Sequence, residues 1–134
     1  KMKFAAVDFN PESVASFHRR GLRIFFGDAS DIEFLKSLPL SSAKAVISTV
    51  PSPEDQSVLI AFVRQCNPRA IIIASLYHKK YLASLYGAGA DYVILPHLFG
   101  GAWAADVIGR GELSGRNFWR KYRRQQERDL SGSE

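Results

Sequence analysis

Acidic and small polar residues follow several short apolar segments of this 134-residue chain. Lys3 to Val7 is followed by Asp8, and Leu22 to Phe26 is followed by Gly27-Asp28-Ala29. An acid at the end of a strand can accept hydrogen bonds from both hydroxyls of a ribose. The alternative is that Asp8 only caps the turn that follows it. Both interpretations of Asp8 remain open from the residue alone.

The second segment has two compatible interpretations. Gly27 lets the backbone approach a flat ligand, and Asp28 can accept a hydrogen bond from an adenine amino group. Ser30 or Asp31 can also cap the next helix. A third apolar segment ends in Ser48-Thr49-Val50. Ligands of doubly wound sheets bind outside the carboxyl ends of the strands, so these segments form the predicted ligand edge.

Catalytic and metal-binding patterns are missing from the sequence. His18, His78 and His97 fall on three different predicted elements, and Cys66 is the single cysteine. No spacing predicts a metal-ligand pair or a Ser-His-Asp set. A glycine-rich G-x-G-x-x-G turn is also absent. We therefore predict a protein that is not an enzyme, with no catalytic residue and no metal ligand.

The elements that must position the ligand edge alternate along the chain. Strand-like apolar segments are separated by segments with helical periodicity, which predicts a parallel sheet covered on both faces. The expected fold class is α/β, with a doubly wound parallel sheet. The predicted strands are Lys3–Val7, Leu22–Phe26, Ala45–Val50, Ala70–Ala74 and Tyr92–Leu95, and the predicted helices follow Asn10 and span about Ile32–Leu38, Glu54–Cys66 and His78–Tyr86.

Charge is concentrated near the carboxyl terminus. The chain carries a net charge of +5, and Arg110 to Arg128 holds seven basic but only two acidic residues.

The longest apolar runs are far shorter than the ~20 residues of a membrane-spanning helix. A single cysteine favours a reducing compartment, so we expect a cytoplasmic location.

Residues after Pro96 predict a helix with an apolar stripe. Phe99, Trp103 and Val107 recur at every fourth position, which favours a partner surface. Asn117 to Arg128 predicts a basic helix or an arm without fixed structure. For this tail we rank a solvated or docking helix first, contact with anionic lipid second and nucleic acid last.

Four stretches, in this order and with this spacing, resemble a known family: Val7–Glu12, Gly27–Asp31, Ala43–Thr49 and Gly89–Pro96. They resemble the RCK or KTN domains, nucleotide-binding regulators of potassium channels, potassium uptake systems and cation:proton antiporters. The resemblance implies a Rossmann-like lobe that binds NAD(H) or an adenine nucleotide such as AMP or ATP as a regulatory ligand. It also implies a homodimer that acts on a membrane transport module, fused or separate, at the cytoplasmic face of the membrane.

The resemblance also implies roles for individual residues. Asp8, with Phe9 and Asn10, would hold the ribose, and Gly27, Asp28 and Ala29 would line the adenine pocket. Ser48, Thr49 and Val50 would border the ligand. The helix that carries Phe99, Trp103 and Val107 would pack against a second subunit.

Three departures from the family pattern limit this transfer. The first strand and its glycine-rich turn are not in this chain, so we expect a segment of a longer protein with membrane spans upstream, and nucleotide binding that the missing turn can weaken or abolish. Ser75 stands where an arginine is common, and Gln56 stands near a common asparagine.

The expected division is a Rossmann-like domain over 1–96, a crossover and dimerisation helix over 97–109 and a basic tail over 110–134. The alternatives are a fragment of an NAD(P)-dependent dehydrogenase, or a dimerisation and docking scaffold without a ligand.

Overall fold

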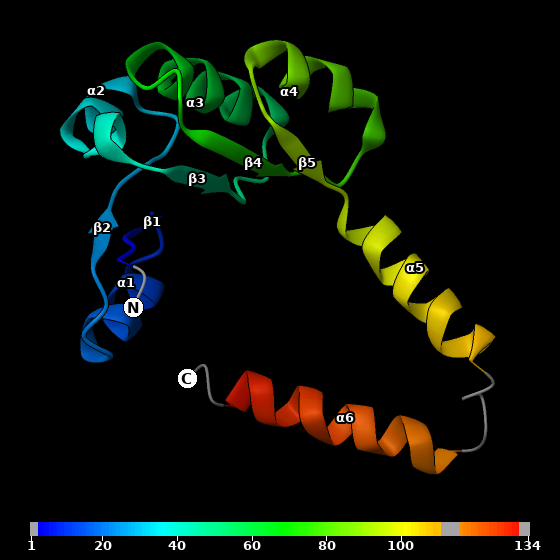
Figure 1. Cartoon of the computed structure of the whole chain (residues 1–134). Coiled ribbons are helices and arrows are strands. Elements are labelled where there is room, and N and C mark those ends of the chain that lie inside the picture. Colours follow the sequence, from blue (N-terminus) through cyan, green and yellow to red (C-terminus); the bar gives the residue numbers. More distant parts are fainter. Residues whose placement is uncertain (1–2, 111–115, 132–134) are drawn as a thin grey trace. The chain divides into compact units, whose positions relative to one another are not determined.

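The computed structural model describes residues 3–110 and 116–131 (Figure 1). The predicted basic tail is therefore described only in part. Two compact units divide the chain, Lys1–Pro96 and His97–Glu134. Strands and helices alternate as predicted: β1 (Ala6–Asp8), α1 (Pro11–Arg19), β2 (Ile24–Phe26), α2 (Ile32–Ser37), a 3-10 turn (Leu40–Ser42), β3 (Ala45–Ser48), α3 (Pro53–Cys66), β4 (Ile71–Ser75), a second 3-10 turn (Lys79–Tyr81), α4 (Leu82–Ala88), β5 (Tyr92–Ile94), α5 (Pro96–Gly109) and α6 (Arg116–Ser131).

All strand pairs of the first unit are parallel, which confirms the predicted α/β class. Strand β1 pairs with β2, and β4 pairs with β3 and β5. The strands form a sheet of two and a sheet of three, not one continuous sheet. In the Rossmann order 3-2-1-4-5-6, strand 1 lies between the parts that correspond to these two sheets. No described strand of this chain occupies that central place, and this explains the separation.

Local capping signals set the helix boundaries. The Asn10 side chain accepts a hydrogen bond from the Glu12 backbone N–H (2.9 Å) and begins α1. Asp31 Oδ1 accepts from Glu33 N–H (2.9 Å) and begins α2. Gly21 has a φ of 68°, so a residue without Cβ follows the end of α1. The sequence predicts a helix after Asn10 and a cap at Ser30 or Asp31, and the structure assigns the second cap to Asp31.

The core lies on one face of the three-stranded sheet, beneath α3 and α4 (Figure 1). Side chains alternate along the strands, so Ile72 and Val93 are buried while Ile47 (66% exposed) and Ile71 (55%) lie on the opposite face. The expectation that both faces are covered is therefore wrong for the described residues. The spacing of Val58, Leu59, Phe62 and Val63 in α3 predicts that these four residues form one buried stripe. In the structure Val58 is exposed, and the buried residues of α3 are Gln56, Leu59, Ile60 and Val63.

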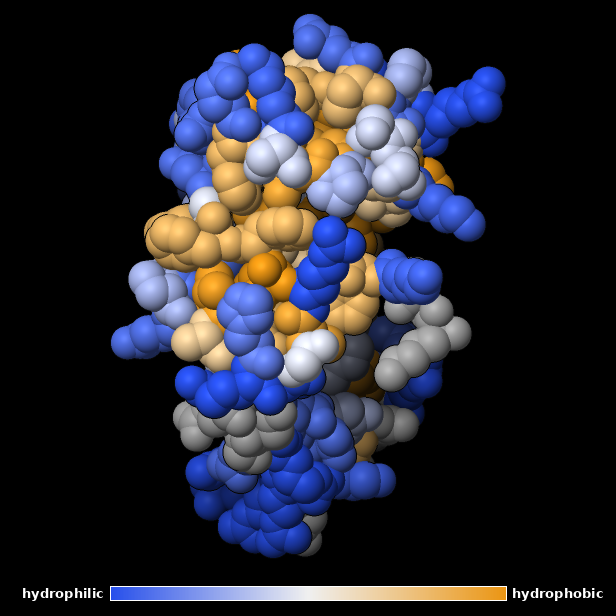
Figure 2. Space-filling model, turned by 90° about the vertical axis from the view of Figure 1, so that its left-hand side faces the viewer, coloured by the Kyte–Doolittle hydropathy of each residue, from blue (hydrophilic) through white to orange (hydrophobic). Residues whose placement is uncertain are grey.

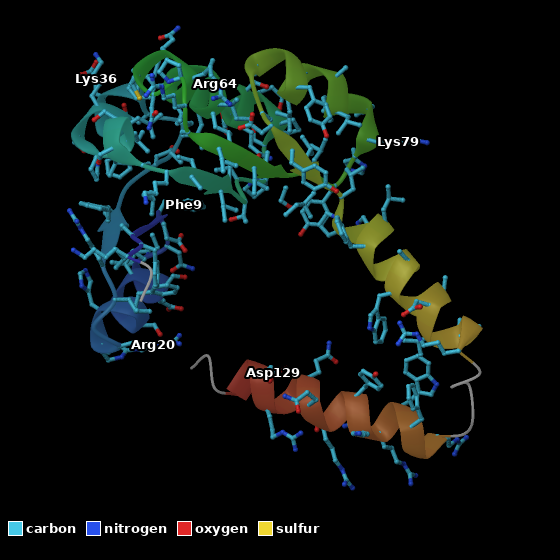
Figure 3. The ribbon with its side chains drawn as sticks, in the orientation of Figure 1. Phe9, Arg20, Lys36, Arg64, Lys79 and Asp129 are labelled. Atoms are coloured by element: carbon cyan, nitrogen blue, oxygen red, sulfur yellow. The ribbon has the colours of Figure 1, made fainter. Side chains whose placement is uncertain are left out.

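An arginine of α3 joins the helix to the loops that precede β4 and β5. Arg64 donates hydrogen bonds to the carbonyl oxygens of Gly89 (2.6 Å) and Ala70 (2.9 Å), and to Asp91 Oδ2 (3.0 Å). The same Asp91 oxygen accepts from Ile72 N–H at 2.7 Å. Figure 3 shows Arg64 on α3, above the sheet. The Ile72 hydrogen bond, followed by the Arg64 contact, lowers the pKa of the Asp91 carboxyl.

The second unit consists of α5 and α6, which meet through aromatic rings. Trp103 of α5 lies 6.2 Å from Trp119 and 5.5 Å from Tyr122 of α6, between ring centroids. Val107 is buried, whereas Leu98 and Phe99 are exposed. The predicted basic segment is thus a helix over its described residues. Nowhere in the described ranges is a helix long and apolar enough to cross a bilayer.

Candidate functional site

The carboxyl ends of β1 and β2 lie together because the two strands are parallel and in register. Asp8 stands opposite Phe26 in the pairing. Immediately beyond it, Gly27 N–H donates a hydrogen bond to the Asp8 carbonyl oxygen at 3.1 Å. The backbone therefore brings the two acidic turns predicted for the ligand edge, the one at Asp8 and the one at Asp28, to the same end of this sheet.

The Asp8 carboxylate caps its own turn. Its Oδ1 accepts a hydrogen bond from Asn10 N–H at 2.9 Å, while the Asn10 side chain caps α1. The turn-capping interpretation of Asp8 is therefore realised. Among the described residues, Asp8 Oδ2 receives no hydrogen bond. One oxygen of a half-buried carboxylate thus remains able to accept from a ligand hydroxyl.

Gly27 has a packing reason for lacking a side chain. A Cβ atom at this position would overlap the aromatic ring of Phe34, which comes from α2. The glycine therefore admits Phe34, and close approach of a ligand is not needed to account for it.

Asp28 is held as an anion by a neighbouring serine. Its Oδ1 accepts from the Ser30 backbone N–H and from the Ser30 hydroxyl, both at 2.8 Å. The backbone hydrogen bond, then the hydroxyl, lowers the pKa of the exposed Asp28 carboxyl. An ionised carboxylate only accepts hydrogen bonds, so Asp28 suits a ligand that presents an amino group or a hydroxyl.

Exposed aromatic rings accompany these acids. Phe9 is 70% exposed and Phe26 is 60% exposed, and both lie at the carboxyl ends of their strands. Figure 3 places Phe9 at the end of β1, and Figure 2 shows apolar side chains gathered across the middle of the face where β1 and β2 lie. A flat apolar surface beside hydrogen-bond acceptors fits the shape and chemistry of a nucleoside.

The third predicted segment ends a strand of the other sheet. Ser48 is almost fully buried, and its hydroxyl oxygen accepts from Val50 N–H at 3.4 Å. Thr49 is exposed. Val50 and Ala29 both pack against the core of the three-stranded sheet. Strand pairing therefore brings together Asp8, Phe9, Asn10, Gly27, Asp28 and Ala29, but it does not join them to Ser48, Thr49 and Val50.

The sequence analysis does not predict that the Gln56 side chain is buried. Its side chain is fully buried in the first turns of α3, and Nε2 donates to the Ser75 carbonyl oxygen at 2.7 Å. Oε1 is buried without a partner among the described atoms. This contact fixes the carboxyl end of β4 to α3. The signal in the sequence is a polar residue within an apolar helical stripe.

Metal chemistry finds no support in the described part of the chain. No group of three or more His, Cys, Asp or Glu side chains there could hold a metal ion. The histidines lie on separate elements, His18 in α1, His78 before the second 3-10 turn and His97 in α5. The site at β1 and β2 is therefore a set of hydrogen-bond acceptors and aromatic rings.

Comparison with known proteins links this chain to membrane transport proteins. The family model described as TrkA-N domain matches residues 1–96. The "Probable potassium channel protein 2" of Methanocaldococcus jannaschii is 34% identical over 107 residues, which cover 78% of this chain and 31% of that protein. The "Glutathione-regulated potassium-efflux system protein KefC" of Escherichia coli is 24% identical over 90 residues, 67% of this chain and 14% of that protein. The chain thus spans less than a third of the length of these relatives.

Solved structures share the fold. The TrkA-N domain of the inner membrane protein ybaL from Escherichia coli aligns with a TM-score of 0.74 at 23% identity, covering 79% of this chain and 78% of that one. The GsuK channel bound to NAD aligns at 0.57 and 25% identity, covering 69% and 17%. The Kef carboxyl-terminal domain of Shewanella denitrificans in its AMP-bound form aligns at 0.59 and 11% identity, covering 96% and 93%.

Proposed function

Because this chain belongs to the TrkA-N domain family, we propose that it is the nucleotide-sensing domain of a potassium or other cation transport system. The resemblance to RCK domains that the sequence indicates is confirmed by this membership. In the proposed role no covalent bond is made or broken. Binding of a ligand changes the state of a transport module.

The proposed ligand is NAD(H) or an adenine nucleotide such as AMP or ATP, bound at the carboxyl ends of β1 and β2. The observation that carries this proposal is the Asp8 carboxylate, which uses Oδ1 for its own turn and has Oδ2 without a partner among the described residues. A ribose hydroxyl is a suitable donor to Oδ2, and Phe9 provides a flat surface beside it. Two structural neighbours, the GsuK channel bound to NAD and the Kef carboxyl-terminal domain in its AMP-bound form, support the choice of ligand class.

The proposed partner is a membrane channel or transporter module, fused or separate, with this domain at its cytoplasmic face. Support comes from the relatives, which are a potassium channel protein and a potassium-efflux protein. A ligand can regulate such a module only if it binds two arrangements of the domain with different affinity. We therefore propose that ligand binding changes how two copies of the domain are arranged.

Helix α5 is the proposed homodimer contact. Of the residues expected there, Val107 is buried and Trp103 contacts α6, whereas Phe99 is 53% exposed. Leu98, next to Phe99, is 65% exposed. The amino-terminal half of α5 is therefore the part that a second copy would cover.

A scaffold without a ligand is the second candidate. Phe34 fills the space beside Gly27, and strand pairing leaves Ser48 apart from Asp8. Both observations favour a domain that dimerises and docks without a nucleotide. The predicted dehydrogenase fragment has no comparable support, since the relatives are transport proteins.

Calorimetric titration separates these candidates. NAD, NADH, ATP and AMP would be titrated into this chain and into the same chain extended upstream by about 30 residues, the length of one βα unit with its turn. Saturable binding of one nucleotide to either protein is the expected result. If neither protein binds any of the four, the sensor proposal is wrong and the scaffold is favoured.

A further inference from the structure

Helix α6 has two chemically distinct faces. Arg116, Arg120, Arg124 and Arg128 recur at every fourth position, which places them along one stripe of an α-helix. Lys121 joins them, and Arg120, Lys121, Arg124 and Arg128 line one shallow depression of the surface. We call these five residues the cationic face. With six basic and two acidic residues, α6 carries a net charge of +4, most of the +5 of the whole chain.

The opposite face of α6 is aromatic and already has a partner. Phe118, Trp119 and Tyr122 form ring contacts with one another, at centroid distances from 4.9 to 6.3 Å. Trp119 and Tyr122 also contact Trp103 of α5. Trp119 and Tyr122 are therefore engaged in joining the two helices, and Phe118 packs against them. They are not arranged as a free platform on which nucleic-acid bases could stack.

Neither acidic residue of α6 pairs with Lys121 or Arg124 of the cationic face. Glu127, at the edge of the cationic face, pairs with Arg123 at 2.7 Å. Gln125 donates to Asp129 Oδ1, at the side of α6 that carries the rings. Lys121 and Arg124 have no ion-pair partner among the described residues. The basic residues are thus spread over about 18 Å of the helix, the length of twelve helical residues.

We infer that the cationic face of α6 lies on the surface of an anionic phospholipid bilayer while the aromatic face stays packed on α5. An extended row of cations complements an extended array of phosphates, whereas a single small anion would need cations that converge on one point. The choice of a lipid over other polyanions rests on the proposed function, since the relatives are transport proteins. Each basic residue near such a surface contributes about 1 kcal/mol.

Vesicle co-sedimentation of the 134-residue chain tests this inference. Vesicles of phosphatidylcholine are compared with vesicles in which about one third of the lipid is phosphatidylglycerol. We expect binding only to the anionic vesicles, with loss of binding as salt rises from about 0.1 M to about 0.5 M. The double variant Lys121→Gln, Arg124→Gln should lower the partition coefficient about 30-fold, at about 1 kcal/mol for each charge.

A matched control removes the same charge elsewhere. The double variant Arg19→Gln, Arg20→Gln changes exposed residues at the end of α1 and should bind vesicles as the unchanged chain does. Equal loss of binding in both double variants would overturn the inference, because total charge would then explain it. Failure to bind anionic vesicles, or tighter binding to duplex DNA than to the vesicles, would also overturn it.

Tryptophan fluorescence reports on the aromatic face. The only two tryptophans of the chain are Trp103 and Trp119, and both belong to the ring cluster. If α6 lies on the lipid by its cationic face, their emission maximum stays unchanged on binding. A blue shift would show the rings entering the bilayer and would contradict the proposed orientation. Nucleotide titration of the Lys121→Gln, Arg124→Gln variant tests the proposed nucleotide binding separately from vesicle binding and tryptophan emission. Failure of lipid binding and failure of the proposed function can therefore be told apart.

Discussion

Gly27 stands at a point where the Phe34 ring leaves no room for a Cβ atom. The sequence identifies Gly27 as a special position, but it assigns the reason to a ligand. Phe34 lies seven positions further along the chain, and its contact with Gly27 depends on how α2 packs back on the strand. A glycine required by packing and a glycine required by a ligand look the same in a sequence.

We predict that Gly27→Ala lowers the free energy of unfolding by about 1–3 kcal/mol, the usual cost of forcing a side chain into filled space. Chemical denaturation measures this difference. The control is Gly87→Ala in α4, where no atom lies within 4 Å of the added Cβ. Alanine favours helix, so this control should be neutral or slightly stabilising.

The double variant Gly27→Ala, Phe34→Ala refines the same prediction. If the Phe34 ring is the cause, adding Phe34→Ala costs less stability in the Gly27→Ala background than in the unchanged chain. Additive losses of stability would contradict the proposed contact.

At the scale of elements, the sequence predicts where helices end more reliably than it predicts which helix face is buried. Asn10, Gly21 and Asp31 predict helix ends correctly because each acts on backbone groups within three residues. The buried face of α3 is predicted less well. Val58 is as apolar as its buried neighbours, and only the position of the sheet leaves it exposed and buries Gln56 instead.

Asp91 gives α3 and β4 a stability that depends on pH. Its pKa is lowered in the folded chain, so its contribution is complete at pH values well above the ordinary pKa of 3.8 and is lost as the pH falls below it. We predict that Asp91→Asn lowers Tm most near pH 7, and that the difference from the unchanged chain shrinks towards pH 3. Thermal unfolding followed by circular dichroism at several pH values measures this. A difference that is constant over that range would contradict the role of the Asp91 charge.

For the whole molecule, the sequence predicts the fold class but not how the strands divide into sheets. Each apolar segment is a local feature, so the alternation of strands and helices can be read directly. Pairing depends on which strands are neighbours in space, and β1 and β3 are not hydrogen-bonded to each other. For this reason the ligand edge predicted from Asp8, Gly27 and Ser48 is divided between two sheets.

The proposed homodimer gives a prediction at the same scale. Phe99→Asp should convert a dimer into a monomer in light scattering after size exclusion, because it places a charge on the exposed apolar half of α5. Val58→Asp is the matched control, since Val58 is also exposed and apolar but lies on α3. A dimer that survives Phe99→Asp, or one that Val58→Asp also dissociates, would place the contact elsewhere.

Affinity for the nucleotide after Asp8→Asn tests the central claim most directly. Asparagine keeps the side-chain oxygen that accepts from Asn10 N–H, so Tm should change little. The charged acceptor for the ribose is lost, and calorimetry should show affinity at least about tenfold weaker, as expected for a hydrogen bond to a charged group. Unchanged affinity in the Asp8→Asn variant would show that Asp8 only caps its turn, and would contradict a nucleotide site at the carboxyl ends of β1 and β2.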